Sequence, residues 1–108
     1  MIGSVMVQVT TAAGSRENAE KIARSAVESK LAACAQVNGP VTSYFTWKGE
    51  NCKEEEWLCV MKTLSSLSRE LMEFVKRNHP YETPEIIVSP VIEVLQEYLD
   101  WMTEVTLV

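Results

Sequence analysis

The chain has few of the residues on which common catalytic motifs depend. It holds one histidine and four glycines among 108 residues. Four glycines at these positions form none of the glycine-rich patterns that cradle nucleotide phosphates, and no serine-hydrolase elbow is present. The single histidine, His79, excludes histidine-rich zinc motifs. We therefore predict that the protein is not an enzyme.

Positive charge is also scarce, and no long apolar run exists. Ten Lys and Arg residues face 15 Asp and Glu residues, for a net charge of −5. This balance disfavours nucleic-acid binding and docking on anionic lipid, both of which need clustered Lys and Arg. No segment approaches the roughly 20 apolar residues of a membrane-spanning helix. We expect neither a nucleic-acid partner nor a membrane.

The three cysteines are odd in number and match no zinc-knuckle spacing: Cys34, Cys52 and Cys59. The N-terminus shows no basic segment followed by an apolar stretch, as a secretory signal would. Free thiols are typical of a reducing compartment. The sequence therefore predicts a cytoplasmic protein without structural zinc.

The pattern of hydrophobic residues predicts one domain over residues 1–108, because this length suits a single core. We expect strands near 5–10, 31–47, 55–62 and 85–91, and helices over 15–30, from Ser66 to the residue before Pro80, and from 95 onward. A bend or bulge is expected at 38–40. This order is the βαββαβ pattern of a ferredoxin-like α+β sandwich, followed by an additional C-terminal helix.

The second and third strands form a long hairpin with large side chains on both faces. One face can cover the helices of its own chain, and the other needs a different partner. A second subunit is the simplest partner, so we expect an oligomer.

Two residues could bind a metal ion, Cys34 and His79. Thiolate and imidazole are ligands that suit copper and zinc. The two would meet if the start of the second strand lies beside the loop after the second helix. The alternatives stay open: Cys34, between two alanines, is also typical of a small packed residue, and a loop histidine is often hydrogen-bonded to backbone. A Cys–His catalytic pair is a formal further option.

Acidic and aromatic residues of the hairpin are interpreted more simply. Residues 54–56 are three consecutive glutamates at the start of a strand, so neighbours face opposite ways, and we interpret them as solvated charges or edge protection. The aromatic residues could stack on a base, but without flanking Lys or Arg we expect them to pack: Tyr44, Phe45, Trp47 and Trp57.

Four stretches together resemble the CutA family of divalent-cation tolerance proteins. They read KLAACA at 30–35, YFTWKG at 44–49, VMKT at 60–63 and HPYETPE at 79–85. The resemblance extends from Val5 to the last helix. It implies a ferredoxin-like fold that assembles as a homotrimer, with the hairpins of neighbouring subunits extending one another's sheets.

The resemblance also implies a function in tolerance of copper or another divalent cation. The family's candidate ligands fall on Cys34 and His79. Some members carry a second histidine directly before the HPY motif, where this chain has Asn78, so one donor is missing and we expect weak binding. The alternative function is a trimeric signalling or scaffold protein, similar to nitrogen-regulatory trimers, that binds a small effector in an intersubunit cleft. Trp47, Lys62 and Tyr81 would line that cleft.

Overall fold

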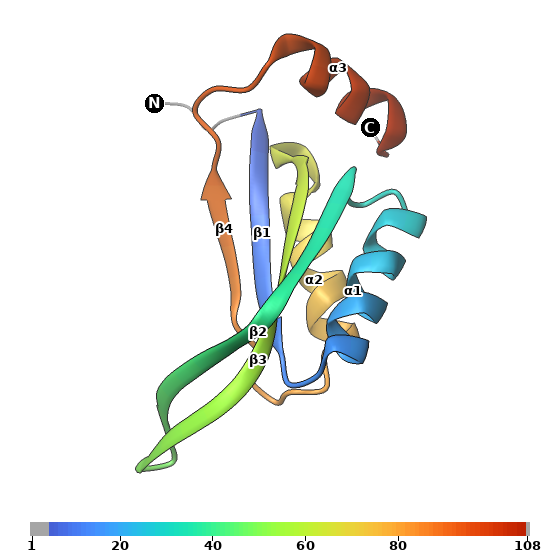
Figure 1. Cartoon of the computed structure of the whole chain (residues 1–108). Coiled ribbons are helices and arrows are strands. Elements are labelled where there is room, and N and C mark those ends of the chain that lie inside the picture. Colours follow the sequence, from blue (N-terminus) through green and yellow to red (C-terminus); the bar gives the residue numbers. More distant parts are fainter. Residues whose placement is uncertain (1–4, 108) are drawn as a thin grey trace.

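The computed structural model describes residues 5–107. Figure 1 shows the order of its elements, which confirms the predicted α+β fold with an added C-terminal helix. The elements are β1 (Met6–Ala13), α1 (Arg16–Glu28), β2 (Cys34–Trp47), β3 (Glu50–Leu64), the short 3-10 helix η1 (Ser65–Leu67), α2 (Ser68–Asn78), β4 (Ile86–Pro90) and α3 (Gln96–Val105). No helix of this described range is long and apolar enough to cross a membrane.

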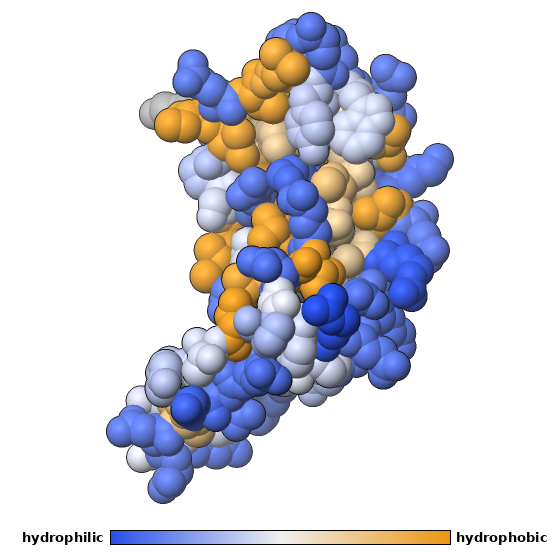
Figure 2. Space-filling view, in the orientation of Figure 1, coloured by the Kyte–Doolittle hydropathy of each residue, from blue (hydrophilic) through white to orange (hydrophobic). Residues whose placement is uncertain are grey.

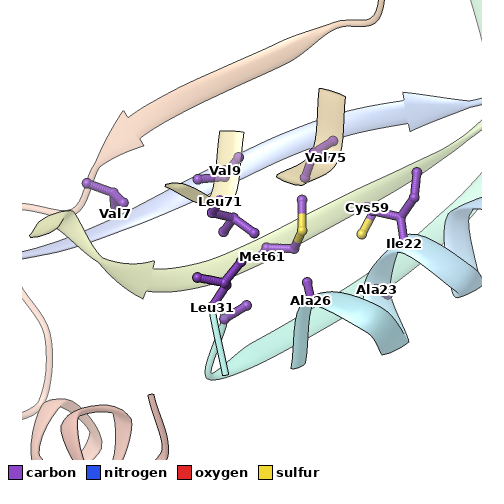
Figure 3. Packing of buried hydrophobic residues seen from close by; sticks show 11 residues of the cluster. Val7, Val9, Ile22, Ala23, Ala26, Leu31, Cys59, Met61, Leu71 and Val75 are labelled. Atoms are coloured by element: carbon purple, nitrogen blue, oxygen red, sulfur yellow. The ribbon is translucent and has the colours of Figure 1, made fainter. Parts of the chain in front are cut away.

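The four strands form one antiparallel sheet in the order β2-β3-β1-β4. Helices α1 and α2 cover one face of it. Figure 3 shows the core at this contact, where Leu71 of α2 lies beside Met61 and Ile22 of α1 beside Cys59, both residues of the central strand β3. On the opposite face, α3 covers only one end of the sheet, through Met102 packed on Met6. The rest of that face, called the open face below, has no helix over it among residues 5–107.

Capping residues in the sequence determine where the helices begin, and one of the two predicted caps was wrong. Ser15 caps α1 as its composition predicts: the backbone N–H of Asn18 donates to the Ser15 hydroxyl oxygen at 3.1 Å. Ser66 does not cap α2. Residues 65–67 form η1 instead, and the Ser68 hydroxyl donates back to the Ser65 carbonyl oxygen at 2.9 Å. The helix then ends at Asn78, two residues before Pro80, as predicted.

The expected irregularity at 38–40 is a shift in the pairing of β2 with β3. Asn38 pairs with Leu58, whereas Val41 pairs with Glu56, so β2 holds an extra residue here. Gly39 makes the close approach possible, since a Cβ there would lie 2.6 Å from Cδ1 of Trp57. Beyond the bulge, the hairpin projects past the end of the sheet (Figure 1).

The open face and the sheet edges expose apolar groups. β2 and β4 are the edge strands, so each has one side without a strand partner in the described chain. Ile87 of β4 is 52% exposed, and beyond β4 Ile92 is 90% and Leu95 69% exposed. Figure 2 shows hydrophobic surface gathered at the end of the molecule where β4 leads into α3, whereas the projecting hairpin is mostly hydrophilic.

Candidate functional site

An open cleft of about 750 Å³ lies between the hairpin and residues 81–85. The size lies in the range of small-molecule sites. Twelve residues line it: Ala12, Ser43, Tyr44, Phe45, Trp47, Cys52, Glu54, Glu56, Tyr81, Glu82, Thr83 and Glu85. Four of them are glutamates, and none is a lysine, arginine or histidine. Every charged residue that lines the cleft is therefore acidic.

The register shift in β2 selects the side chains that face the cleft. After the shift, Ser43 pairs with Glu54 and Phe45 with Cys52, and residues paired directly across a sheet share a face. Glu54 and Glu56 lie two residues apart on β3 and so point the same way, while Glu55 points to the other face. The hairpin thus presents aromatic rings from one strand and carboxylates from the other to the same space.

Glu56 and Tyr81 join the two walls of the cleft. The Tyr81 hydroxyl donates a hydrogen bond of 2.9 Å to Oε2 of Glu56. Glu56 is only 8% exposed, although three consecutive glutamates predicted solvated charges. Burial, followed by the bond to Glu56 and the charges of Glu56 and Glu54, raises the pKa of Tyr81 to about 12. The phenol therefore stays protonated and serves as a donor at neutral pH.

His79 fixes the segment that carries Tyr81. Its ring is buried, and its Nε2 lies 2.8 Å from the carbonyl oxygen of Ala12, at the end of β1. The backbone N–H of Tyr81 donates to its Nδ1 at 3.1 Å. Because a backbone N–H can only donate, Nδ1 is the acceptor and Nε2 carries the proton that it donates to Ala12. Both ring nitrogens are engaged with backbone, which is one of the alternatives that the sequence left open.

Cys34 lies elsewhere, at the start of the edge strand β2. It pairs with Lys62 on β3, whereas Ala12, the partner of His79, pairs with Leu58. Four residues of β3 separate the two levels, about 13 Å along the strand. The chain therefore does not bring Cys34 and His79 together. Within residues 5–107, no group of three or more His, Cys, Asp or Glu residues is placed to hold a metal ion.

The three thiols differ in their surroundings. Cys34 and Cys52 are free and partly exposed, whereas Cys59 is buried in the core and also free. Burial raises the pKa of Cys59 to about 11, so its thiol stays protonated at neutral pH. The Tyr98 hydroxyl of α3 lies beside Cys34; burial and then this cysteine raise the pKa of Tyr98.

The structure divides the residues predicted to line an effector cleft. Trp47 and Tyr81 line the cleft described above. Lys62 does not line it, because it lies next to Cys34, with its Nζ donating to Oε1 of Gln36 at 2.6 Å. Sequence reasoning missed the roles of Glu54 and Glu56. Their spacing of two residues put them on one face, but only the position of Tyr81 shows that this face lines a cleft.

We predict that His79→Ala lowers the free energy of unfolding by about 2–3 kcal/mol, because it leaves the Ala12 carbonyl and the Tyr81 N–H without partners and opens a cavity. His79→Gln keeps a donor near Nε2, and His79→Asn keeps an acceptor near Nδ1, so each should recover about 1 kcal/mol. Urea unfolding at one fixed protein concentration measures these differences. An alanine variant as stable as the wild type would contradict the assigned role.

The raised pKa values of Tyr81 and Cys59 predict that the folded chain loses stability at alkaline pH. A raised pKa means that the folded chain holds its proton more tightly than the unfolded chain. The stabilisation is complete below the ordinary pKa values of 9.0 for Cys59 and 10.0 for Tyr81, and it is lost as pH rises toward about 11 and about 12. Tyr81→Phe should remove the upper part of this decline, while Tyr44→Phe, at an exposed ring, should not. The midpoint of urea unfolding, followed across alkaline pH, measures this decline. Identical pH profiles for the wild type, Tyr81→Phe and Tyr44→Phe would refute the prediction.

Comparison with known proteins identifies related chains over most of this length. The family model described as CutA1 divalent ion tolerance protein matches residues 6–105. The Divalent-cation tolerance protein CutA of Thermus thermophilus is 42% identical over 92 residues, 85% of this chain and 89% of the relative. Protein CutA of Homo sapiens is 43% identical over 88 residues, which are 82% of this chain and 49% of the human protein. The chain thus spans most of the bacterial relative and about half of the human one.

Comparison with solved structures identifies the same family as the sequence comparison. The divalent cation tolerance protein of Thermus thermophilus superposes with a TM-score of 0.89 at 40% identity, covering 94% of this chain and 98% of the other. CutA1 from Oryza sativa gives a TM-score of 0.91 at 32% identity, with 96% and 95% covered. Sequence and fold coincide over nearly the whole described range. The chain belongs to the CutA1 family of divalent ion tolerance proteins.

Proposed function

We propose that this chain forms a cytoplasmic homotrimer that binds divalent cations, copper among them, and supports tolerance of these metals in that way. Family membership supports the connection with divalent cations. The free thiols and the acidic charge balance are compatible with a reducing compartment and with cation binding. Relatives are named from other compartments as well, since one Arabidopsis thaliana protein is called chloroplastic and one Archaeoglobus fulgidus structure periplasmic.

The exposed edges and apolar groups of the open face support assembly. The outer side of β2 has no strand partner in the described part of the chain over its 14 residues, and such an edge binds another strand readily. Ile87, Ile92 and Leu95 add exposed apolar surface at the other side of the sheet. Contact between two different edges of neighbouring subunits is heterologous, and it avoids an open filament only by closing into a ring. The expected number of subunits, three, comes from the family resemblance.

The free Cys34 thiol at an unpaired sheet edge is the observation that carries the proposed copper site. Copper prefers thiolate and imidazole ligands. One described chain supplies no group of three donors, so a neighbouring subunit lying along β2 would have to complete the site. His79 would join it only by giving up its hydrogen bonds to Ala12 and Tyr81. We therefore assign the first ligand to Cys34 and expect weak binding.

The assembly predicts a particle of about three times 12.2 kDa by light scattering. Ile87→Glu places a charge at an exposed position of the open face and should shift the mass toward that of the monomer. Val27→Glu is the matched control, because Val27 is also exposed, at 40%, but lies on α1 in the helical layer. A monomeric wild type, or equal masses for the two variants, would contradict this assignment of the interface.

The copper site predicts that Cys34→Ser lowers copper affinity by at least about tenfold, since a hydroxyl is a poor replacement for a soft thiolate. Cys52→Ser is the matched control, because Cys52 is also free and partly exposed but lies near the hairpin tip. Calorimetric titration against a competing chelator measures both affinities in the intact assembly. Equal affinities for the wild type and Cys34→Ser would refute the site and leave the assembly unaffected.

A further inference from the structure

We propose that α3 opens as a unit separate from the rest of the fold and in this way controls access to the Cys34 thiol. The helix is attached to the sheet through its own small hydrophobic cluster, and Cys34 directly follows one buried member of that cluster, Ala33. A lid of this kind controls the thiol whether or not the thiol binds copper, so it does not rest on the proposed copper site.

The buried hydrophobic residues form two clusters rather than one. The larger cluster lies between the sheet and helices α1 and α2. The smaller one joins α3 to the end of the sheet, and the only fully buried residue that α3 supplies to it is Met102, packed with Met6, Ala33 and Leu64. Within residues 5–107, no residue belongs to both clusters. Because a segment with few buried contacts opens at a lower free energy than the core, α3 can detach while the main core stays folded.

The two ends of α3 are held in different ways. Residues 91–95 connect β4 to α3 and belong to no helix or strand, and the side chains of Ile92 and Leu95 in this connection are mostly exposed. Beyond the other end of the helix, the backbone N–H of Leu107 donates to the Lys30 carbonyl oxygen at 3.0 Å. The connection therefore serves as a hinge for α3 (Figure 1), and the bond from Leu107 to Lys30 holds the closed position.

Lys30 is a fixed anchor for this bond. It lies two residues after the end of α1 and has φ of 64°, the left-handed conformation in which glycine is usual at the end of a helix. The next residue, Leu31, donates its backbone N–H to the Ala26 carbonyl oxygen at 3.1 Å, which closes the end of α1 around Lys30. The main body of the fold thus sets the direction of the Lys30 carbonyl. Opening of α3 breaks the bond to Leu107 without changing α1.

Cys34 lies where α3 meets the sheet. The Tyr98 hydroxyl of α3 lies beside the Cys34 side chain, and the preceding residue, Ala33, is buried in the α3 cluster. The Tyr98 ring also packs against Trp101, with 5.4 Å between the ring centroids, so both rings move with the helix. Cys34 is only partly exposed in the closed position. Movement of α3 away from the sheet removes Tyr98 from the thiol and increases its exposure.

The test compares the three thiols of one protein. The intact assembly reacts with iodoacetamide, a small uncharged reagent, at one fixed pH, and mass spectrometry of the peptides gives a separate rate for each cysteine. Cys52 lies near the hairpin tip and Cys59 is buried in the main core, so both are internal references that opening of α3 leaves unchanged. Cys59 reports global unfolding, and the ratio of the Cys34 rate to the Cys59 rate isolates the opening of α3.

Two matched pairs of variants test the lid. Leu107→Pro removes the N–H that holds the closed position, whereas Leu107→Ala keeps it, so the proline variant should react at Cys34 about three- to tenfold faster than the alanine variant. Met102→Ala opens a cavity in the α3 cluster and should raise the ratio of the Cys34 and Cys59 rates at least about tenfold. Leu71→Ala opens a cavity in the main core and should not raise this ratio. Light scattering verifies that each variant assembles as the wild type does.

The proposal fails if the two Leu107 variants react at Cys34 with the same rate, or if Met102→Ala leaves the ratio of the Cys34 and Cys59 rates unchanged. An equal rise of this ratio in Leu71→Ala would also contradict it, since loss of the main core would then expose Cys34 as well. A Cys34 rate that falls as the protein concentration rises would show that a neighbouring subunit, and not α3, covers the thiol. No copper is present in these measurements, so their outcome is independent of copper binding at Cys34.

Discussion

The pairing shift between Asn38 and Val41 is the constraint on which the site depends. Before it, even-numbered residues of β2 share the open face with even-numbered residues of β3; after it, odd-numbered residues of β2 do so. Phe45 and Trp47 therefore face the same side as Glu54. A regular hairpin would have placed these rings on the opposite side from the carboxylates, because a slip of one residue exchanges the faces of a strand. Gly39, packed against Trp57, is what allows the backbones to approach at this point.

His79 holds the second wall of the cleft, residues 81–85, in place beside this hairpin. Its two hydrogen bonds join the end of β1 to the segment after α2, and they place Tyr81 where its hydroxyl reaches Glu56. The motif that made the family recognisable thus has a structural task in this chain: the imidazole orients backbone, and the phenol closes the cleft. Such a residue would have to give up one of these bonds before it could bind a metal ion.

The fold could be predicted from the sequence because its signals are local. Ser15 caps α1, Pro80 limits α2, and the apolar spacing of the helices is regular. The site could be predicted only in part. Trp47 and Tyr81 line one cleft of the chain and Lys62 lies outside it, but the predicted intersubunit cleft itself stays a prediction. Glu56 was interpreted as a solvated charge, whereas it is buried. These outcomes depend on contacts between residues about 25 positions apart, which no local pattern encodes. The η1 turn before α2 was missed because a serine at either position 66 or 68 fits a helix start equally well.

Two kinds of polar group lie at different levels along β3. Near its C-terminal end, at the level of Lys62, Cys34 offers a soft thiol at a sheet edge, beside the Tyr98 hydroxyl. Near the bulge and beyond it, hard carboxylates and aromatic rings surround the cleft. Copper favours the first set of ligands over the second. About 13 Å of strand lies between the levels of Cys34 and His79. The bulge at Gly39 thus divides the strand pair into two surfaces of different chemistry.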